Sequence, residues 1–215
     1  MRAILEPADA ETVAPTRVLL LPAAYSVPED FLREGFVRTA RERRLSVDLA
    51  FVELKMQHLT DRTILRRLRH EVVLPARALG CRSIWLGGIS LGGFVALAYA
   101  ERYPQEIDGL CLLAPYLGNH IVTGEIERAN GVHEWTPGEL ADDDDERRIW
   151  RFIKGHRERP SPLHLGFGRE DRFADSHRMM ASALAPEDVD VVPGGHEWPV
   201  WLRLWENFLD SCLTR

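Results

Sequence analysis

The chain of 215 residues has few cysteines and no long apolar run. Its three cysteines, Cys81, Cys111 and Cys212, are widely spaced and odd in number, so they fit neither a disulfide framework nor a metal site. We therefore expect a reducing, cytoplasmic setting. No apolar segment approaches the roughly 20 residues that a membrane-spanning helix needs, and the amino terminus lacks the apolar core of a signal peptide.

The chain also lacks an excess of positive charge. It has 33 acidic and 27 basic residues, and the resulting net charge of -6 argues against a nucleic-acid-binding surface. The composition, with 45% hydrophobic and 28% charged residues, is that of an ordinary globular protein. A chain of this length can bury one sizeable core. We expect no nucleic-acid and no membrane partner, and the oligomeric state stays open.

Apolar runs alternate with amphipathic stretches along most of the chain. The runs predict strands at residues 17–21, 46–52, 83–86, 107–114, 162–168 and 189–192. The stretches between them predict helices at 28–44, 61–79, 94–103, 176–184 and 199–209, and Pro75 is expected to kink or interrupt the second of these. This alternation predicts an α/β protein, a three-layer α/β/α architecture with a mostly parallel sheet of about six strands. Residues 1–16 are expected to form an irregular arm or a weak edge strand.

The alternation breaks between residues 115 and 159. We interpret this range as a small cap-like insertion in a single domain that covers residues 1–215. The range contains four consecutive aspartates, Asp142 to Asp145. Consecutive residues point to different sides of a helix, so these acids indicate a solvated helix start and not a metal site.

One motif stands between a predicted strand and a predicted helix, the sequence Gly88-Ile-Ser90-Leu-Gly92. Glycine lacks a Cβ, which permits a tight turn that projects the serine hydroxyl from the carboxyl edge of the sheet. A serine that merely caps the helix is the plain alternative. A third interpretation, a dinucleotide-binding loop ending at Gly93, requires an acidic residue at the end of the next strand, where Ala114 and Pro115 stand.

Two later segments follow strand ends in the same way. Gly168-Arg-Glu-Asp171 follows one strand, and Gly194-Gly-His196-Glu-Trp follows the last. With the serine motif, and in this order, they resemble the nucleophile, acid and histidine segments of the α/β-hydrolase superfamily of serine esterases and thioesterases. The resemblance covers about residues 17–213. It implies a compact α/β-hydrolase fold and a triad of Ser90, Asp171 and His196, with no cofactor and no metal.

The residue types suit this chemistry. A serine hydroxyl is a poor nucleophile until a base removes its proton, and imidazole titrates in the range that allows it to do so. Asp171 would hold His196 in the correct tautomer and stabilise its imidazolium form. The adjacent Glu170 is the competing candidate for the acid. Taken singly, Asp171 could be a loop residue and His196 a surface histidine.

The oxyanion hole departs from the family pattern. Related enzymes usually carry His-Gly after the first core strand, whereas this chain has Pro22-Ala23-Ala24-Tyr25. Because Pro22 has no amide hydrogen, one of the next three amides must act beside the amide of Leu91. We favour Ala24.

These observations predict a serine hydrolase that cleaves a small or medium carboxylic ester or thioester through an acyl-enzyme intermediate. Residues 115–159 are expected to roof the site, and the candidate substrate-binding residues are Tyr25, Tyr116, His120 and Trp135. The last three could equally pack the insertion onto the core. The alternative function is ligand binding or a non-hydrolytic reaction on a hydrolase-like fold, which the departure at Pro22 supports.

Overall fold

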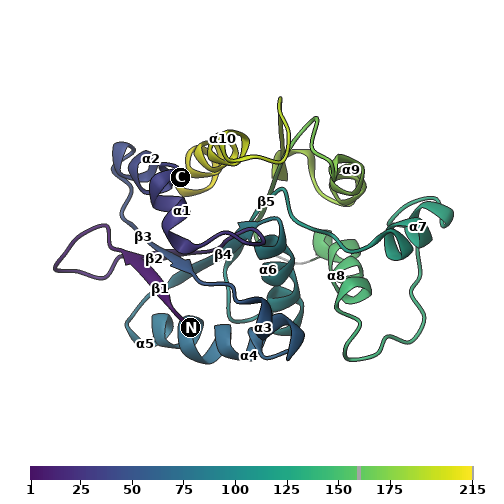
Figure 1. Cartoon of the computed structure of the whole chain (residues 1–215), viewed down its shortest axis with the longest axis horizontal. Coiled ribbons are helices and arrows are strands. Elements are labelled where there is room, and N and C mark those ends of the chain that lie inside the picture. The colour runs from purple at the N-terminus through teal and green to yellow at the C-terminus, as the bar shows by residue number, and fades with distance from the viewer. Residues whose placement is uncertain (159–160, 215) are drawn as a thin grey trace.

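A seven-stranded sheet runs through the centre of the molecule, with helices on both of its faces (Figure 1). The computed structural model describes residues 1–158 and 161–214. The strands, in spatial order, are β1 (Ala3–Glu6), β3 (Val47–Val52), β2 (Thr16–Leu21), β4 (Ser83–Ile89), β5 (Gly109–Leu113), β6 (Leu163–Gly168) and β7 (Val189–Val192). β1 pairs antiparallel with β3, and the other described pairings are parallel. The three-layer α/β/α prediction is confirmed, and the additional strand β1 lies in the segment left open as an arm or an edge strand.

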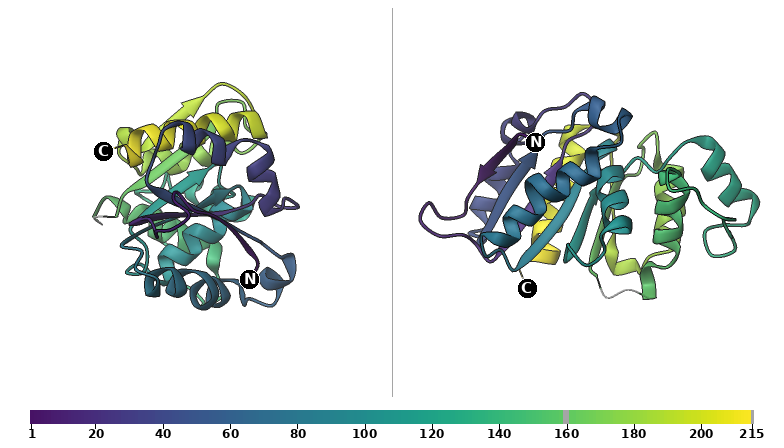
Figure 2. Two further views of the ribbon diagram at one scale, coloured as in Figure 1. Left: turned by 90° about the vertical axis from the view of Figure 1, so that its left-hand side faces the viewer. Right: turned by 90° about the horizontal axis from the view of Figure 1, so that it is seen from below.

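The helices form two layers. One face of the sheet is covered by α1 (Pro28–Arg33), α2 (Phe36–Glu42) and α10 (Trp198–Phe208), followed by a π-helical turn over Leu209–Leu213. The other face is covered by α3 (Met56–Thr60), α4 (Ile64–Leu68), a π-helical turn over Arg69–Val73, α5 (Leu74–Ala78), α6 (Leu91–Arg102), α8 (Asp145–Lys154) and α9 (Ala174–Ser182). Helix α7 (His120–Arg128) projects at the end far from β1 (Figures 1 and 2). Short 3₁₀ turns cover His156–Glu158 and Pro186–Asp188.

Two predicted helices are divided in the structure. The helix predicted over residues 28–44 is split into α1 and α2 by Gly35, whose φ of 94° is left-handed and cannot continue a helix. The helix predicted over residues 61–79 is two short helices joined by the π-helical turn. Pro75 lies in the first turn of α5, where its missing amide hydrogen is not needed.

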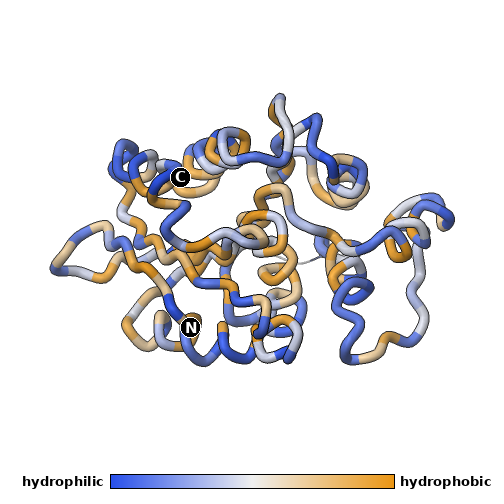
Figure 3. Tube along the Cα trace, in the orientation of Figure 1, coloured by the Kyte–Doolittle hydropathy of each residue, from blue (hydrophilic) through white to orange (hydrophobic). Residues whose placement is uncertain are grey.

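The sheet separates two apolar clusters. Leu86, Val95 and Trp150 belong to the cluster under α6, and Leu20 and Phe31 belong to the cluster under α10. Figure 3 shows the central strands as largely hydrophobic and the outer loops as largely hydrophilic. Because both faces are covered, the central strands β4 and β5 are continuous apolar runs rather than alternating ones. Each fully buried Leu or Phe side chain stabilises the fold by about 1.5–3 kcal/mol.

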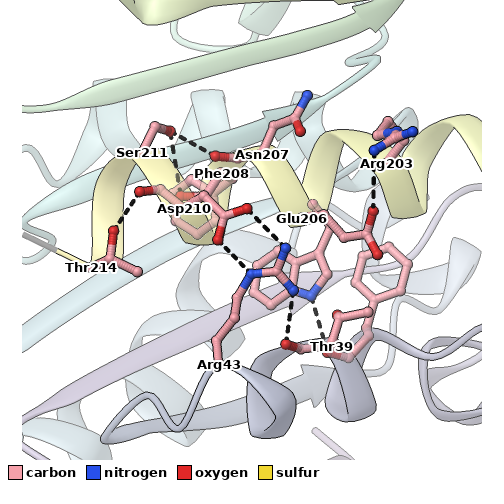
Figure 4. Close-up of polar contacts among 11 residues, drawn as sticks. Thr39, Arg43, Arg203, Glu206, Asn207, Phe208, Asp210, Ser211 and Thr214 are labelled. Atoms are coloured by element: carbon pink, nitrogen blue, oxygen red, sulfur yellow. Dashed lines mark hydrogen bonds and ion pairs between the residues drawn. The ribbon is translucent and has the colours of Figure 1, made fainter.

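A polar clasp joins α2 to the end of the α10 layer (Figure 4). The Arg43 guanidinium donates from Nε to Asp210 Oδ1 at 2.5 Å and from Nη1 to the Thr39 carbonyl at 3.0 Å. Asp210 is more than half exposed, so this ion pair contributes only about 0–1 kcal/mol. Apolar packing, helped by the bond from Trp205 Nε1 to the Phe36 carbonyl, therefore holds α10 on the sheet.

The segment between β5 and β6 contains both a layer helix and an outlying part. Ile149, Trp150 and Ile153 of α8 are fully buried, and Trp150 Nε1 donates to the Leu117 carbonyl at 2.8 Å. Asp144 caps α8 by accepting a bond from the Arg147 amide, which confirms the helix start predicted from the acidic run. The range predicted as an insertion thus includes a helix that packs on α6, while α7 lies outside this packing. Residue 159, the last of that range, lies outside the described residues.

His164 is a buried histidine at the amino-terminal end of β6. Its side chain contacts the Phe208 ring, and the whole residue is only 4% exposed. Burial lowers the pKa of His164 from 6.5 to about 4, and burial lowers the pKa of His177 in α9 by the same extent. Between these two pH values the unfolded chain binds protons that the folded chain does not.

We therefore expect the free energy of unfolding to fall as the pH drops from about 6.5 to about 4, and the contribution of these two histidines to the slope to level off below that range. In His164→Leu the slope should be smaller by up to about 1.4 kcal/mol per pH unit, because one proton is no longer taken up on unfolding. Urea unfolding at several pH values measures this slope. An unchanged slope in His164→Leu would show that the imidazole is protonated equally in both states.

Candidate active site

Ser90 occupies the turn between β4 and α6. Its φ of 51° and ψ of -112° lie in a region that non-glycine residues avoid, and it is 7% exposed. The turn packs closely against the end of β2: a Cβ added to Gly92 would lie 2.2 Å from the Leu21 carbonyl oxygen, so this position requires glycine. The turn therefore packs against the neighbouring strand, and its serine stands at the carboxyl edge of the sheet.

The backbone of Ser90 is held from both sides by the segment that follows β5. The Ser90 amide donates to the Leu113 carbonyl at 3.1 Å, and the Tyr116 amide donates to the Ser90 carbonyl at 2.9 Å. Ala114, between them, also has a positive φ of 47°. Each such residue costs about 1–3 kcal/mol and persists only where its surroundings determine it. We call residues 113–116 the serine clamp.

The buried Asp171 and the partly buried His196 form a pair at the same edge of the sheet. Asp171 Oδ2 lies 2.7 Å from His196 Nδ1, and Asp171 Oδ1 accepts a bond from the Phe173 amide at 2.8 Å. Burial alone would raise the pKa of Asp171, but the bonds from His196 and Phe173 outweigh it and lower the pKa below 3.8. Because the carboxylate can only accept, Nδ1 of His196 carries the hydrogen and donates it to Asp171, which leaves the lone pair on Nε2.

Glu170 has a different partner. Its Oε2 accepts a bond from the Gly194 amide at 2.5 Å, and its own amide donates to the Gly194 carbonyl at 3.1 Å. These bonds join the loops that follow β6 and β7. Glu170 thus fixes the loop that carries His196, while Asp171 contacts the imidazole itself.

Aromatic contacts connect Ser90 to this pair. The Tyr116 ring lies 5.9 Å from the Phe173 ring, which lies 5.2 Å from the His196 ring in an edge-to-face arrangement. Trp201 packs on His196 at 5.0 Å. Within residues 1–158 and 161–214 the Ser90 hydroxyl makes no hydrogen bond, and such bonds often tighten only when substrate binds.

The loop after β2 is where the sequence predicts the second oxyanion donor. The Ser26 amide closes a turn onto the Ala23 carbonyl at 3.1 Å, and Tyr25 takes the left-handed φ of 64°. Among the described residues, no acceptor is bound by the amide of Ala24 or by that of Leu91 at the start of α6. β2 and β4 are neighbours at the point where the strand order reverses, which is where α/β sheets bind ligands.

The four candidate substrate-binding residues differ in their surroundings. Tyr25 is 95% exposed, and His120 is exposed at the start of α7. Tyr116 is half-buried between Phe94 and Phe173; burial and the Glu146 carboxylate raise the pKa of its hydroxyl. Trp135 is 4% exposed within the core, where it packs the segment as the structural alternative requires.

The rest of the described chain offers no other obvious catalytic group. No set of three or more His, Cys, Asp or Glu side chains in residues 1–158 and 161–214 is arranged to hold a metal ion. A cavity of about 420 Å³ lies between α4, α6 and the start of α8, but its lining carries four arginines and four acidic residues and does not include Ser90. None of the described helices has the length and apolar composition needed to cross a bilayer.

Phe173 and His177 lie beside the triad candidates but carry no sequence motif. Phe173 packs against His196, and the fully buried His177 packs against Phe173 at 6.5 Å. The only sequence feature that could have indicated their place in the site is that both follow Asp171 by two to six residues. Aromatic residues at such positions are usually interpreted as core packing.

Comparisons with known proteins agree with this geometry. A family model described as the alpha/beta hydrolase fold matches residues 54–148. Several solved structures are similar over nearly the whole chain, and two of them are described below. The chain has the α/β-hydrolase fold. Est1E from Butyrivibrio proteoclasticus has a TM-score of 0.66 at 14% identity and covers 99% of this chain and 94% of its own. FphF, a fluorophosphonate-binding serine hydrolase of Staphylococcus aureus, has a TM-score of 0.65 at 15% identity and covers 97% and 90%.

One curated relative of this chain is an acetyl esterase of Caldicellulosiruptor saccharolyticus. It is 24% identical over 137 residues, which is 57% of this chain and 52% of the esterase. The match therefore spans about half the length of that relative.

Substitutions of Asp171 and Glu170 test which of the two carboxylates acts on His196. Asp171→Asn should lower kcat by about 10³–10⁴-fold, because the neutral amide no longer stabilises the imidazolium of His196. Glu170→Gln, the matched control, keeps an oxygen for the Gly194 amide and should lower kcat far less. Ester hydrolysis by both variants gives the ranking. The opposite order would assign the acid role to Glu170.

Proposed function

We propose that this α/β-hydrolase is a serine hydrolase that cleaves a small or medium carboxylic ester, or a thioester, through a covalent acyl-enzyme. The observation that supports it best is the strained Ser90 at the same sheet edge as the Asp171–His196 pair. Strain at a position that aims a hydroxyl outward is typical of a nucleophile. The names of the related esterases support the same class of reaction.

The proposed mechanism begins with proton transfer. His196 Nε2 removes the Ser90 proton as Oγ attacks the carbonyl carbon, and Asp171 stabilises the resulting imidazolium. The tetrahedral intermediate then collapses, and His196 returns the proton to the departing alcohol or thiol. Water, activated by the same imidazole, attacks the acyl-enzyme and releases the carboxylic acid and the free serine.

The amides of Leu91 and Ala24 are the proposed oxyanion donors. The negative charge develops on the carbonyl oxygen only when Oγ attacks, so two preorganised N–H groups stabilise the transition state more than the substrate. Backbone amides serve this role whatever side chain they carry. The absence of a glycine after β2 therefore does not prevent the chemistry.

The substrate is proposed to bind between the loop after β2 and the segment at residues 115–159. Tyr116 would contact the acyl group, because its ring lies beside Phe94 and Phe173 and its amide binds Ser90. Tyr25 and His120 are exposed at the two sides and would contact the leaving group. Trp135 stays a proposed contact of lower rank because it is buried in the core.

The nucleophile is tested by covalent labelling. A fluorophosphonate probe should modify Ser90, as located by peptide mass spectrometry, because only an activated serine attacks phosphorus at a useful rate. Ser90→Ala should lose the label and lower ester turnover by about 10⁴-fold or more. Thermal unfolding of the variant serves as the folding control. Full turnover in folded Ser90→Ala would refute the mechanism, and an unlabelled wild type that binds esters would favour the non-hydrolytic alternative.

Acyl-chain length tests the proposed pocket. We expect kcat/KM for p-nitrophenyl esters to be highest between acetate and hexanoate and low for palmitate, because the rings of Phe94, Tyr116 and Phe173 close one side of the serine turn. Tyr116→Ala keeps the backbone amide that binds Ser90 and should shift the optimum to longer chains. A maximum at palmitate in the wild type would contradict the short pocket.

A further inference from the structure

His177 is a buried polar residue that the proposed mechanism does not use. It lies in α9 and is fully inaccessible to solvent. Its Nε2 lies 2.9 Å from the Pro115 carbonyl oxygen, and its ring packs 5.1 Å from the ring of Phe167. Burying an imidazole costs free energy unless its polar atoms are hydrogen-bonded. The bond to the Pro115 carbonyl offsets part of that cost for His177.

The protonation state of His177 follows from that bond. A carbonyl oxygen can only accept, so Nε2 carries the hydrogen and donates it. Nδ1 is buried and has no hydrogen-bond partner among the described residues. Burial lowers the pKa of His177 to about 4, so the ring is neutral at neutral pH. A neutral donor fixed at one atom orients a neighbour but carries no charge into the site.

The neighbour that it orients is the centre of the serine clamp. Pro115 lies between Leu113 and Tyr116, whose backbone groups bind the amide and the carbonyl of Ser90. The clamp contains the left-handed Ala114 and must hold a strained serine. Since the Pro115 carbonyl is fixed by His177, the orientation of the clamp is fixed from α9 and not only from β5.

The same helix carries the other half of the triad candidates. The Ala174 amide, at the start of α9, donates to the Asp171 carbonyl at 2.9 Å. Phe173 lies between the rings of His177 and His196, 6.5 Å from the first and 5.2 Å from the second. His177 is thus joined to the serine clamp through a hydrogen bond and to the Asp171–His196 pair through its own helix.

We propose that His177 is a positioning residue that sets the placement of Ser90 relative to His196 through its hydrogen bond to the Pro115 carbonyl. The inference rests on the proposed hydrolase function, because it concerns the geometry of that reaction. The group touches neither the substrate nor the reacting atoms. Its effect should therefore fall on kcat and leave substrate binding largely unchanged.

The test uses kcat per labelled active site. Titration with a fluorophosphonate counts the competent serines, so a misfolded fraction does not lower the value. His177→Leu removes the donor and should lower kcat per labelled site by about ten- to a hundredfold, because displacements of about 1 Å are that costly. KM should stay within about twofold, since uniform substrate binding is not affected.

Two amide variants test the donor itself. The Gln side chain in His177→Gln can place an N–H near the former Nε2 and should restore kcat per labelled site to within about fivefold of the wild type. The shorter Asn side chain in His177→Asn falls short of the Pro115 carbonyl and should behave like His177→Leu. If His177→Leu does not fold, the Gln and Asn variants still decide the question, and equal values for them would overturn the proposal.

His164→Leu is the matched control. His164 is also a buried histidine with a pKa of about 4, but it lies at the amino-terminal end of β6, away from the serine clamp. Its variant should keep the wild-type kcat per labelled site. A loss equal to that of His177→Leu would assign the effect to general loosening and overturn the proposal, as would an unchanged kcat in His177→Leu. A wild-type protein that is not labelled at all would instead refute the proposed function.

Discussion

The conformation of Ser90 is the constraint on which the site depends. Its φ of 51° is strained for an L-residue. Packing against Leu21 and hydrogen bonds to Leu113 and Tyr116 hold the backbone in this conformation. The carbonyl of Leu21 excludes any side chain at Gly92, and the serine clamp binds both polar groups of the Ser90 backbone. The apolar interior behind the turn, formed by α6 and the strands beside it, supplies the stability that offsets this strain.

The sheet explains why residues distant in sequence meet at this turn. β4 lies between β2 and β5, so the loop that carries Ala24 follows one neighbouring strand and the serine clamp follows the other. β6 and β7 follow in order, and bonds between Glu170 and Gly194 join their loops. The Asp171–His196 pair is therefore held by a unit of two loops and α9. The Phe173 and Tyr116 rings bridge this unit to the serine turn.

The parallel strands and the main motifs could be predicted because their signals are local. Most strands are short apolar runs, and Ser90, Asp171 and His196 each stand within four residues of the end of a strand. The division of α1 from α2 depends on one glycine with a positive φ, and the π-helical turn before α5 depends on how Pro75 fits the layer. The role proposed for His177 could not be predicted from the sequence, because it rests on a hydrogen bond to a carbonyl 62 residues away. Tertiary contacts of this kind leave no periodicity to detect.

The loop after β2 shows how the fold accommodates an altered sequence. Where related enzymes usually have a glycine, this chain has alanines, and the left-handed residue is Tyr25. The turn from Ala23 to Ser26 closes around it, so the reversal of direction that a glycine would permit occurs one or two positions later. The amide of Ala24 stays without an acceptor at the start of this turn, beside the end of β2. A strained aromatic residue that is 95% exposed gains nothing from packing. Backbone strain of this kind gathers at functional sites, which agrees with the proposed roles of the Ala24 amide and the Tyr25 ring.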